Sequence, residues 1–162
     1  MLIKLKNKET LVIDDFVFNC SIGKEGTKSN KIEGDKSTPK GLFSLGKFYY
    51  RADKVKKPET KLNINTIKKD MGWCNDSRSK FYNSEVKISK NYRYEKLFRN
   101  DYKYDYILVI NHNSKKVPYK GSAIFLHLTK DYKPTAGCIA LKEKDFLIML
   151  KLVNKETKIK IY

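Results

Sequence analysis

The chain has 162 residues, of which 35 are basic and 18 acidic, so its formal net charge at pH 7 is +17. This length predicts one domain, residues 1–162, with room for a sizeable core. No apolar run approaches the roughly 20 residues of a transmembrane helix, so no transmembrane segment is expected. The three cysteines, Cys20, Cys74 and Cys138, cannot all pair within the chain, and at least one free thiol is expected.

Only four of the basic residues are arginine, the side chain suited to bidentate phosphate and base-edge contacts. A surface dominated by lysine favours diffuse attraction to polyanions and argues against specific nucleic-acid recognition. The alternative is that most lysines are simply solvated. Composition alone leaves both interpretations open.

The N-terminal third predicts short strands followed by a long loop. Apolar and polar residues alternate at 2–5, 10–13 and 16–22, with turn-like breaks between them, as in a β-meander. Residues 23–41 are polar and interrupted by glycine and proline, which predicts a loop that is functional or mobile. A strand pattern resumes at 42–49.

The middle of the chain is less regular. Residues 72–83 are aromatic and polar without either period, which indicates an ordered loop that lines a site or an irregular surface connection. Helical spacing of apolar residues predicts a short helix at 94–99. The apolar run 106–110 suits a central strand, and 123–126 suits another that ends on His127.

The C-terminal segment predicts an amphipathic helix at 142–153 and a last strand at 158–161. Apolar residues recur at i, i+3, i+4 and i+7, the spacing of a helix that packs one face on a core. These residues are Phe146, Met149, Leu150 and Val153. The whole pattern predicts a mainly β domain with short peripheral helices.

One stretch carries residues suited to covalent catalysis. His127 precedes Cys138 by eleven positions, and the cysteine lies between Gly137 and the apolar Ile139. A thiol in a tight turn, with a histidine at the end of a neighbouring strand as its base, would be a nucleophile, and the Gly137 and Cys138 amides would form an oxyanion hole. A buried structural cysteine and a satisfied core histidine remain the alternative on local sequence alone.

A zinc site is the other chemistry that the residue types permit. Cys74, His112, His127 and Cys138 are suitable ligands, but none has the paired spacing of a Cys-x-x-Cys motif. No carboxylate pair and no glycine-rich phosphate loop stands out. We therefore expect neither a metal nor an organic cofactor.

Two separated motifs stand out. The first is 33–43, Glu-Gly-Asp-Lys-Ser-Thr-Pro-Lys-Gly-Leu-Phe, and the second is the distant His127 followed by 135–138, Thr-Ala-Gly-Cys. Both resemble motifs of the YkuD-type (ErfK/YbiS/YcfS/YnhG) L,D-transpeptidase catalytic domains of bacterial cell-wall synthesis. A branch of the family is also similar at 72–76, Tyr82-Asn83, 109–113 and 121–125.

The resemblance implies a YkuD-like β-sandwich or barrel and a cysteine acyltransferase. The Cys138 thiolate would attack the carbonyl that precedes the terminal D-alanine of a peptidoglycan tetrapeptide stem, and His127 would protonate the departing amine. Gly137 would contribute to the oxyanion hole. The residues expected to contact substrate are Trp73, Asp76, Tyr82, Asn83, His112, Asn113 and Thr135.

Two positions depart from the family pattern. Ala136 stands where a second histidine is usual, and Ala140 stands where arginine or asparagine is usual. If the usual side chains hold the substrate carboxylate or the oxyanion, then His112, Asn113, Trp73 or the lysines are expected to substitute. Donor and acceptor are therefore less well defined than the reaction type.

Three functional alternatives follow. The acyl-enzyme is resolved by an amine, as in a transpeptidase, or by water, as in an L,D-carboxypeptidase or endopeptidase, or the chain is a non-enzymatic polyanion-binding module. Peptidoglycan stem peptides are the expected partners, and we expect a monomer. The family implies the periplasm or cell envelope; the N-terminal residues lack the apolar stretch of a signal peptide, which leaves a cytoplasmic location open.

Overall fold

The computed structural model describes residues 1–162 and contains fourteen strands and one helix. Nine of the strands form one sheet, three form a second, and two short strands pair by themselves. The elements are β1 (Leu2–Leu5), β2 (Thr10–Ile13), β3 (Phe16–Ser21), β4 (Thr27–Lys28), β5 (Thr38–Pro39), β6 (Gly41–Tyr50), β7 (Ile64–Thr66), β8 (Met71–Cys74), β9 (Glu85–Lys87), β10 (Tyr94–Lys96), β11 (Tyr106–Ile110), β12 (Phe125–Leu128), β13 (Ile139–Leu141), α1 (Glu143–Leu152) and β14 (Lys158–Ile161).

The three N-terminal strands form the predicted antiparallel meander. Strand β2 pairs with both β1 and β3, and β2 and β3 are joined by the two-residue turn Asp14-Asp15. Asp14 has φ of 47°, in the left-handed region that two-residue hairpin turns require and that aspartate tolerates. The sequence pattern of this region is therefore confirmed.

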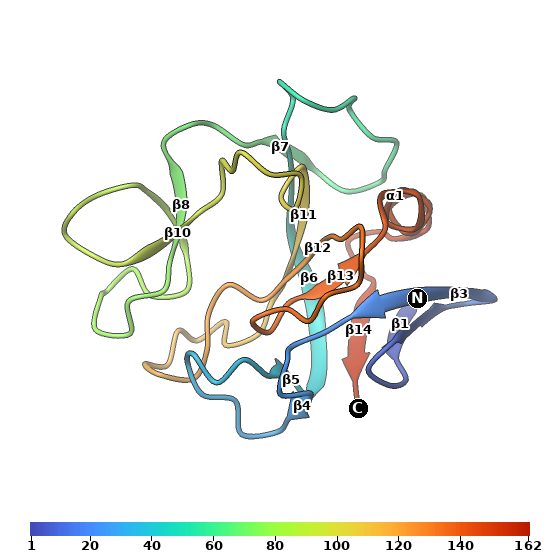
Figure 1. The fold of residues 1–162 in the computed structure, drawn as a ribbon, viewed down its shortest axis with the longest axis horizontal. Coiled ribbons are helices and arrows are strands. Elements are labelled where there is room, and N and C mark those ends of the chain that lie inside the picture. Colours follow the sequence, from blue (N-terminus) through green and yellow to red (C-terminus); the bar gives the residue numbers. More distant parts are fainter.

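The large sheet closes on itself into a barrel. Its order runs β11-β12-β13-β3-β2-β1-β14-β6, and β6 pairs with β11 again. Two features make the closure possible: β1 and β14 pair in parallel, and the long β6 pairs with β14 near its start and with β11 near its end. The predicted mainly β, barrel-like fold is confirmed, and Figure 1 shows both chain termini on the same side of it.

Side chains of β12 and β13 alternate between two separate cores. Leu126, Leu128, Ile139 and Leu141 point into the barrel and join its main core. Phe125 and Cys138 point the other way, into a second cluster with Trp73 and Tyr104. Both faces are buried, so the outer face of this part of the barrel can carry an enclosed site.

The cover over that outer face is the three-stranded sheet β10-β8-β9, which lies to one side of the barrel in Figure 1. Its Trp73 stacks edge-on against Phe125 of the barrel, with ring centroids 5.2 Å apart. Leu97, just after β10, is also fully buried in the second cluster. This small sheet therefore covers the outer face of the barrel at β12 and β13 and encloses the space between them.

The helix α1 packs its apolar face on the barrel core, as its spacing predicts. Phe146, Met149 and Leu150 are fully buried, and Val153 follows the helix and is buried as well. Burial of such side chains is worth about 1.5–3 kcal/mol each. The helix has neither the length nor the apolar character needed to cross a membrane.

Three sequence expectations are wrong in detail. Residues 94–96 form strand β10 instead of a short helix. Pairing with β8 satisfies their backbone hydrogen bonds, whereas a single isolated helical turn is costly to nucleate. Residues 71–74 are strand β8 instead of the start of a loop. His127 lies inside β12 instead of at its end.

Candidate active site

A tight turn presents Cys138 at the start of β13. The Thr135 hydroxyl accepts a hydrogen bond from the Gly137 amide at 3.0 Å and donates one to the Cys138 carbonyl at 2.6 Å. The Thr38 hydroxyl, from the long loop, donates to the Gly137 carbonyl at 2.8 Å. The turn is thus closed from within and anchored to the Thr-Pro motif far away in sequence.

Gly137 is required by this geometry. Its φ is +143°, and a Cβ at this position would lie 2.8 Å from the Ser37 carbonyl oxygen. A side chain here would meet backbone, which cannot move aside cheaply. Gly137 therefore allows two loops to pack closely beside Cys138.

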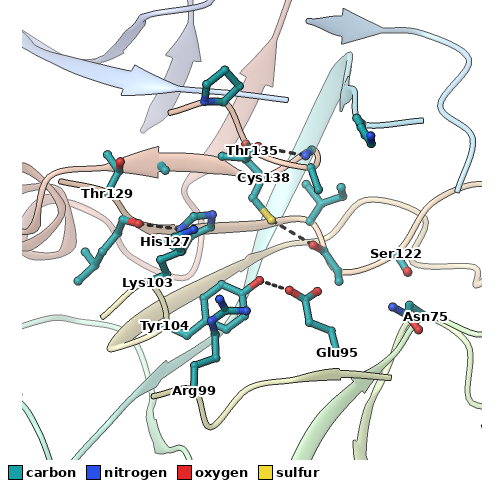
Figure 2. A pocket seen from close by; sticks show the side chains of 18 of the residues that line it. Asn75, Glu95, Arg99, Lys103, Tyr104, Ser122, His127, Thr129, Thr135 and Cys138 are labelled. Atoms are coloured by element: carbon teal, nitrogen blue, oxygen red, sulfur yellow. Dashed lines mark hydrogen bonds between the residues drawn. The ribbon is translucent and has the colours of Figure 1, made fainter. Parts of the chain in front are cut away.

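The Cys138 thiol is buried, with only 8% of the residue exposed. Its Sγ donates to the Ala123 carbonyl at 3.2 Å, the contact drawn as a dashed line from the sulfur in Figure 2, and accepts from the Phe125 amide at 3.4 Å. Burial raises the pKa of Cys138 to about 12, and the Glu95 carboxylate adds to the rise, while the Phe125 amide and Lys31 oppose it. The resting sulfur is a neutral thiol.

His127 is also buried and neutral, and its tautomer is defined. Its Nδ1 lies 2.9 Å from the Leu128 carbonyl oxygen, which can only accept, so Nδ1 carries the proton and Nε2 is left with a free lone pair. Burial lowers the pKa of His127 to about 4. The imidazole can therefore accept a proton at neutral pH.

The parallel pairing of β12 with β13 brings the two residues together. His127 is in register with Ala140, two residues beyond Cys138 and on the same face of the sheet. Both side chains line one cavity of about 860 Å³. No hydrogen bond joins them in this structure, so proton transfer requires the thiol to turn from Ala123 to Nε2.

The amide of Cys138 makes no hydrogen bond within the protein. The Gly137 amide, in contrast, is occupied by Thr135. Of the two amides expected to form an oxyanion hole, only that of Cys138 is available in this structure. A substrate carbonyl oxygen could accept from it as the sulfur attacks.

The opposite wall of the cavity carries a polar cluster that the sequence analysis did not identify. The Tyr104 hydroxyl donates to the Glu95 carboxylate, and the Arg99 guanidinium lies 5.1 Å from the centre of the Tyr104 ring (Figure 2). Burial raises the pKa of Glu95 and holds that of Tyr104 well above its ordinary value. Glu95 and Arg99 lie in the segment 94–99, whose apolar spacing predicted only a helix, and Tyr104 belongs to no motif, so no sequence signal pointed to these three as site residues.

Six of the seven residues expected to contact substrate do not line this cavity; only Thr135 does. Asn83 explains much of the difference. Its side chain accepts from Trp73 Nε1 at 3.0 Å and the Ala123 amide at 3.1 Å, and donates to the His112 and Asn113 carbonyls. These residues form a hydrogen-bonded support behind the segment whose Ala123 carbonyl holds the thiol.

Tyr82 and Asp76 have similar supporting positions. The Tyr82 hydroxyl accepts from the Gly121 amide at 3.0 Å and donates to Glu33, which itself lines the cavity. Asp76 accepts from the Arg78 and Arg93 amides and stabilises a turn. The similarity at these motifs therefore reflects the scaffold of the site.

His112 and Asn113 are held by the loop that precedes β12. His112 Nε2 lies 2.8 Å from the Lys120 carbonyl oxygen, and Asn113 donates to the Gly121 carbonyl at 3.0 Å. Neither is directed to Cys138. Neither therefore replaces the side chains that are missing at Ala136 and Ala140.

The chain has no group of three or more His, Cys, Asp and Glu side chains placed to hold a metal ion. Cys20 and Cys74 are buried free thiols outside the cavity. Burial raises the pKa of Cys20 to about 12. Cys138 is the one cysteine that lines the cavity with a histidine.

The fold and the site together define a barrel-like domain in which a cysteine in a tight turn and a histidine line one cavity. In a comparison with protein families, residues 2–161 match the YkuD L,D-transpeptidase catalytic domain, and the chain belongs to this family. A comparison with curated proteins gives no match.

Proposed function

We propose that the protein is a cysteine-dependent L,D-transpeptidase that acts on peptidoglycan tetrapeptide stems through a thioester on Cys138. Membership of the family supports L,D-transpeptidase activity on peptidoglycan. The observation that carries the mechanism is the shared cavity, in which a thiol, an imidazole with a free Nε2 and the unpartnered Cys138 amide line one space.

The first half-reaction would form the thioester. The thiol proton moves to His127 Nε2 as Sγ attacks the carbonyl carbon before the terminal D-alanine, and the carbonyl oxygen becomes an oxyanion that accepts from the Cys138 amide. The carbon–nitrogen bond then breaks, and His127 returns the proton to the departing amine.

The second half-reaction would resolve the thioester. An amine of another stem attacks the thioester carbon, His127 removes its proton, and the thiol leaves with that proton. The product is a cross-link, or a trimmed tripeptide if water replaces the amine. The family is generally associated with the cell envelope, which is where we place this reaction.

Acylation by a carbapenem tests the nucleophile. Carbapenems acylate the nucleophilic cysteine expected in this family, so intact-mass measurement should give a single adduct on the wild-type protein. The Cys138→Ala variant should give none, whereas Cys74→Ala should react like the wild type. An adduct that persists in Cys138→Ala would remove Cys138 from the mechanism.

Purified tetrapeptide muropeptides test the acceptor. Both reactions release free D-alanine; a transpeptidase also yields cross-linked dimers, whereas a carboxypeptidase yields uncross-linked tripeptides. Loss of both products in Cys138→Ala would tie either reaction to the thioester.

A non-enzymatic polyanion-binding module is the competing interpretation, based on the net charge of +17. It predicts binding to anionic polymers that weakens steeply as the salt concentration rises. It also predicts that carbapenems do not acylate the Cys138 thiol. Carbapenem acylation separates the two interpretations directly.

A further inference from the structure

A buried lysine lies next to the nucleophile turn with part of its hydrogen-bonding capacity unused. Lys31 is 5% exposed and lines the same cavity as Cys138. Its ammonium donates to Asp35 Oδ1 at 2.5 Å and to the Ile32 carbonyl at 3.2 Å. An ammonium has three N–H donors, so one donor has no partner within the protein.

Neighbouring glycines locate this ammonium. A Cβ at Gly137 would lie 3.7 Å from Lys31 Nζ, and a Cβ at Gly121 would lie 2.9 Å from Lys31 Cγ. The lysine stem therefore passes Gly121 and places its charge beside the residue that precedes Cys138. Both glycines leave room for it.

Asp35 holds the ammonium in a fixed position. Its Oδ1 also accepts from the Ser37 amide at 2.9 Å and the Ser37 hydroxyl at 2.7 Å. Although burial favours the neutral acid, the hydrogen bonds from Lys31, Ile32 and Ser37 hold the pKa of Asp35 well below its usual range. The ion pair is thus preorganised, which is the property that an electrostatic binding site needs.

The remaining charges of the cavity favour an anionic ligand. Five basic and three acidic side chains line it, leaving an excess of two positive charges. These are Lys31, Lys36, Arg99, Lys103 and Lys133, with Glu33, Glu95 and Asp131. Lys31 is the basic side chain among them that lies deepest and closest to the nucleophile turn.

We propose that Lys31 binds the carboxylate of the residue that leaves the donor, through its third N–H. This rests on the proposed function, in which the departing residue carries a carboxylate two bonds from its amine. The transient oxyanion has its own donor in the Cys138 amide. A permanent ammonium suits a permanent charge, and it would select donors that end at this residue over donors that are amidated or extended.

Alkylation of Cys138 tests the anion site without peptidoglycan. Iodoacetate and iodoacetamide have the same reacting carbon and differ in charge, so the ratio of their rates at Cys138, measured by peptide mass mapping, reports attraction for a carboxylate. A charge-assisted hydrogen bond corresponds to a preference of roughly tenfold. We expect Lys31→Gln and Lys31→Met to lower the iodoacetate-to-iodoacetamide ratio by about that factor.

The ratio removes two ambiguities. Any effect of Lys31 on thiol reactivity alters both reagents equally and cancels. Lys40→Gln is the matched control, since Lys40 is an exposed lysine of the same loop outside the cavity, and its ratio should equal that of the wild type. Lys31→Gln keeps donors for Asp35 and Ile32, and a thermal melt checks that the variant is folded. An unchanged ratio in folded Lys31→Gln overturns the proposal.

Synthetic donors identify the carboxylate. The wild type should form the acyl-enzyme at least tenfold faster from a tetrapeptide ending in D-alanine than from the same peptide ending in D-alaninamide, and Lys31→Gln should remove this preference. Equal slowing of both donors would mean that Lys31 serves the oxyanion or the fold, and would overturn the proposal.

The two experiments also separate this inference from the proposed function. If neither donor acylates the wild type, the proposed function and the assignment to the leaving residue both fail. In that case a Lys31-dependent iodoacetate preference would still establish an anion site of another substrate.

Discussion

At the residue scale, the burial of Cys138 and His127 decides what kind of pair they form. Burial raises the pKa of the thiol to about 12 and lowers that of the imidazole to about 4, so both charged forms are disfavoured. The resting pair is neutral, so in the proposed mechanism the proton moves to His127 only as the sulfur attacks. His127 would then act as a general base instead of maintaining a stable thiolate.

This neutral pair predicts the pH dependence of Cys138 acylation by a carbapenem. The rate should be nearly constant from pH 5.5 to 8, because His127 is already unprotonated, and should fall as the pH drops through about 4. His127→Gln should lower the rate roughly 10²- to 10⁴-fold, the usual contribution of a general base. A wild-type rate that rises tenfold per pH unit between 5 and 8 would indicate a free thiolate and contradict the pair.

His127 also predicts how stability depends on pH. The unfolded chain binds a proton on this histidine below about pH 6.5, whereas the native state binds it only below about pH 4. The stabilising contribution is fully present above pH 6.5 and is lost as the pH falls toward 4. The resulting loss in the free energy of unfolding at pH 4 is about 2–3 kcal/mol. The free energy of unfolding, measured in urea at pH 7 and pH 4, should fall by that much less in His127→Gln. Equal losses in both proteins would contradict the neutral, buried histidine.

At the element scale, the nucleophile turn depends on a loop almost a hundred residues away. Thr38 anchors the Gly137 carbonyl, and the Ser37 carbonyl lies where a Gly137 side chain would be. The Thr-Pro motif and the Gly-Cys motif thus form one packed unit. This contact gives a physical reason for two motifs that the sequence presents separately.

Gly137→Ala tests this packed unit. The substitution combines a φ of +143° with a Cβ 2.8 Å from backbone, so we expect a loss of more than about 3 kcal/mol in the free energy of unfolding. Gly34→Ala is the matched control: its φ is +79° and its Cβ would contact nothing within 4 Å, so about 1–2 kcal/mol is expected. Similar losses in both variants, measured by denaturant unfolding, would show that the turn tolerates a side chain.

The elements that were predicted poorly are those whose form depends on a partner. Residues 94–96 have helical spacing of apolar side chains, yet they become β10 because β8 offers an edge to pair with. The final helix and the N-terminal meander were predicted well, because each element buries one face and exposes the other, which gives a clear period in the sequence.

At the scale of the whole molecule, the first and last strands close the barrel. β1 and β14 pair in parallel, so Ile159 is in register with Ile3 on one side and with Phe43 on the other. Ile159 is fully buried in the main core. The end of the chain is therefore a structural part of the sheet.

Ile159→Ala should destabilise the protein by about 2–5 kcal/mol, because removing the side chain leaves a void in the core at β14, the strand that joins two parts of the sheet. Val17→Ala is the comparison, since Val17 also lies in a strand but is 68% exposed, and it should lose less than about 1 kcal/mol. Urea unfolding of the two variants measures the difference. A loss below about 1 kcal/mol for Ile159→Ala would mean that β14 contributes little to the fold.

The charge of the molecule acts mainly at its surface and in its cavity. Three of the eight ion pairs join exposed lysines to exposed carboxylates, as in Lys151–Glu59 and Lys133–Asp131, and such pairs contribute little to stability. Lys31–Asp35 is the pair in which both side chains are least exposed, and it lies beside the turn that carries Cys138. The proposed anion site therefore depends on the position of Lys31 and not on the overall charge.

The sequence by itself determined the β content, the final helix, the family resemblance and the pairing of His127 with Cys138 as candidates, because each rests on local periodicity or on a short motif. Only the tertiary structure decided that β12 and β13 run in parallel and that the site lies on the outer face of the barrel. It also decided that most of the expected substrate residues support the site from behind and that Lys31, Glu95 and Tyr104 line it. Side chains of strands buried on both faces show no alternation in sequence, and contacts between distant loops leave no local pattern, so these features follow only from how the chain closes on itself.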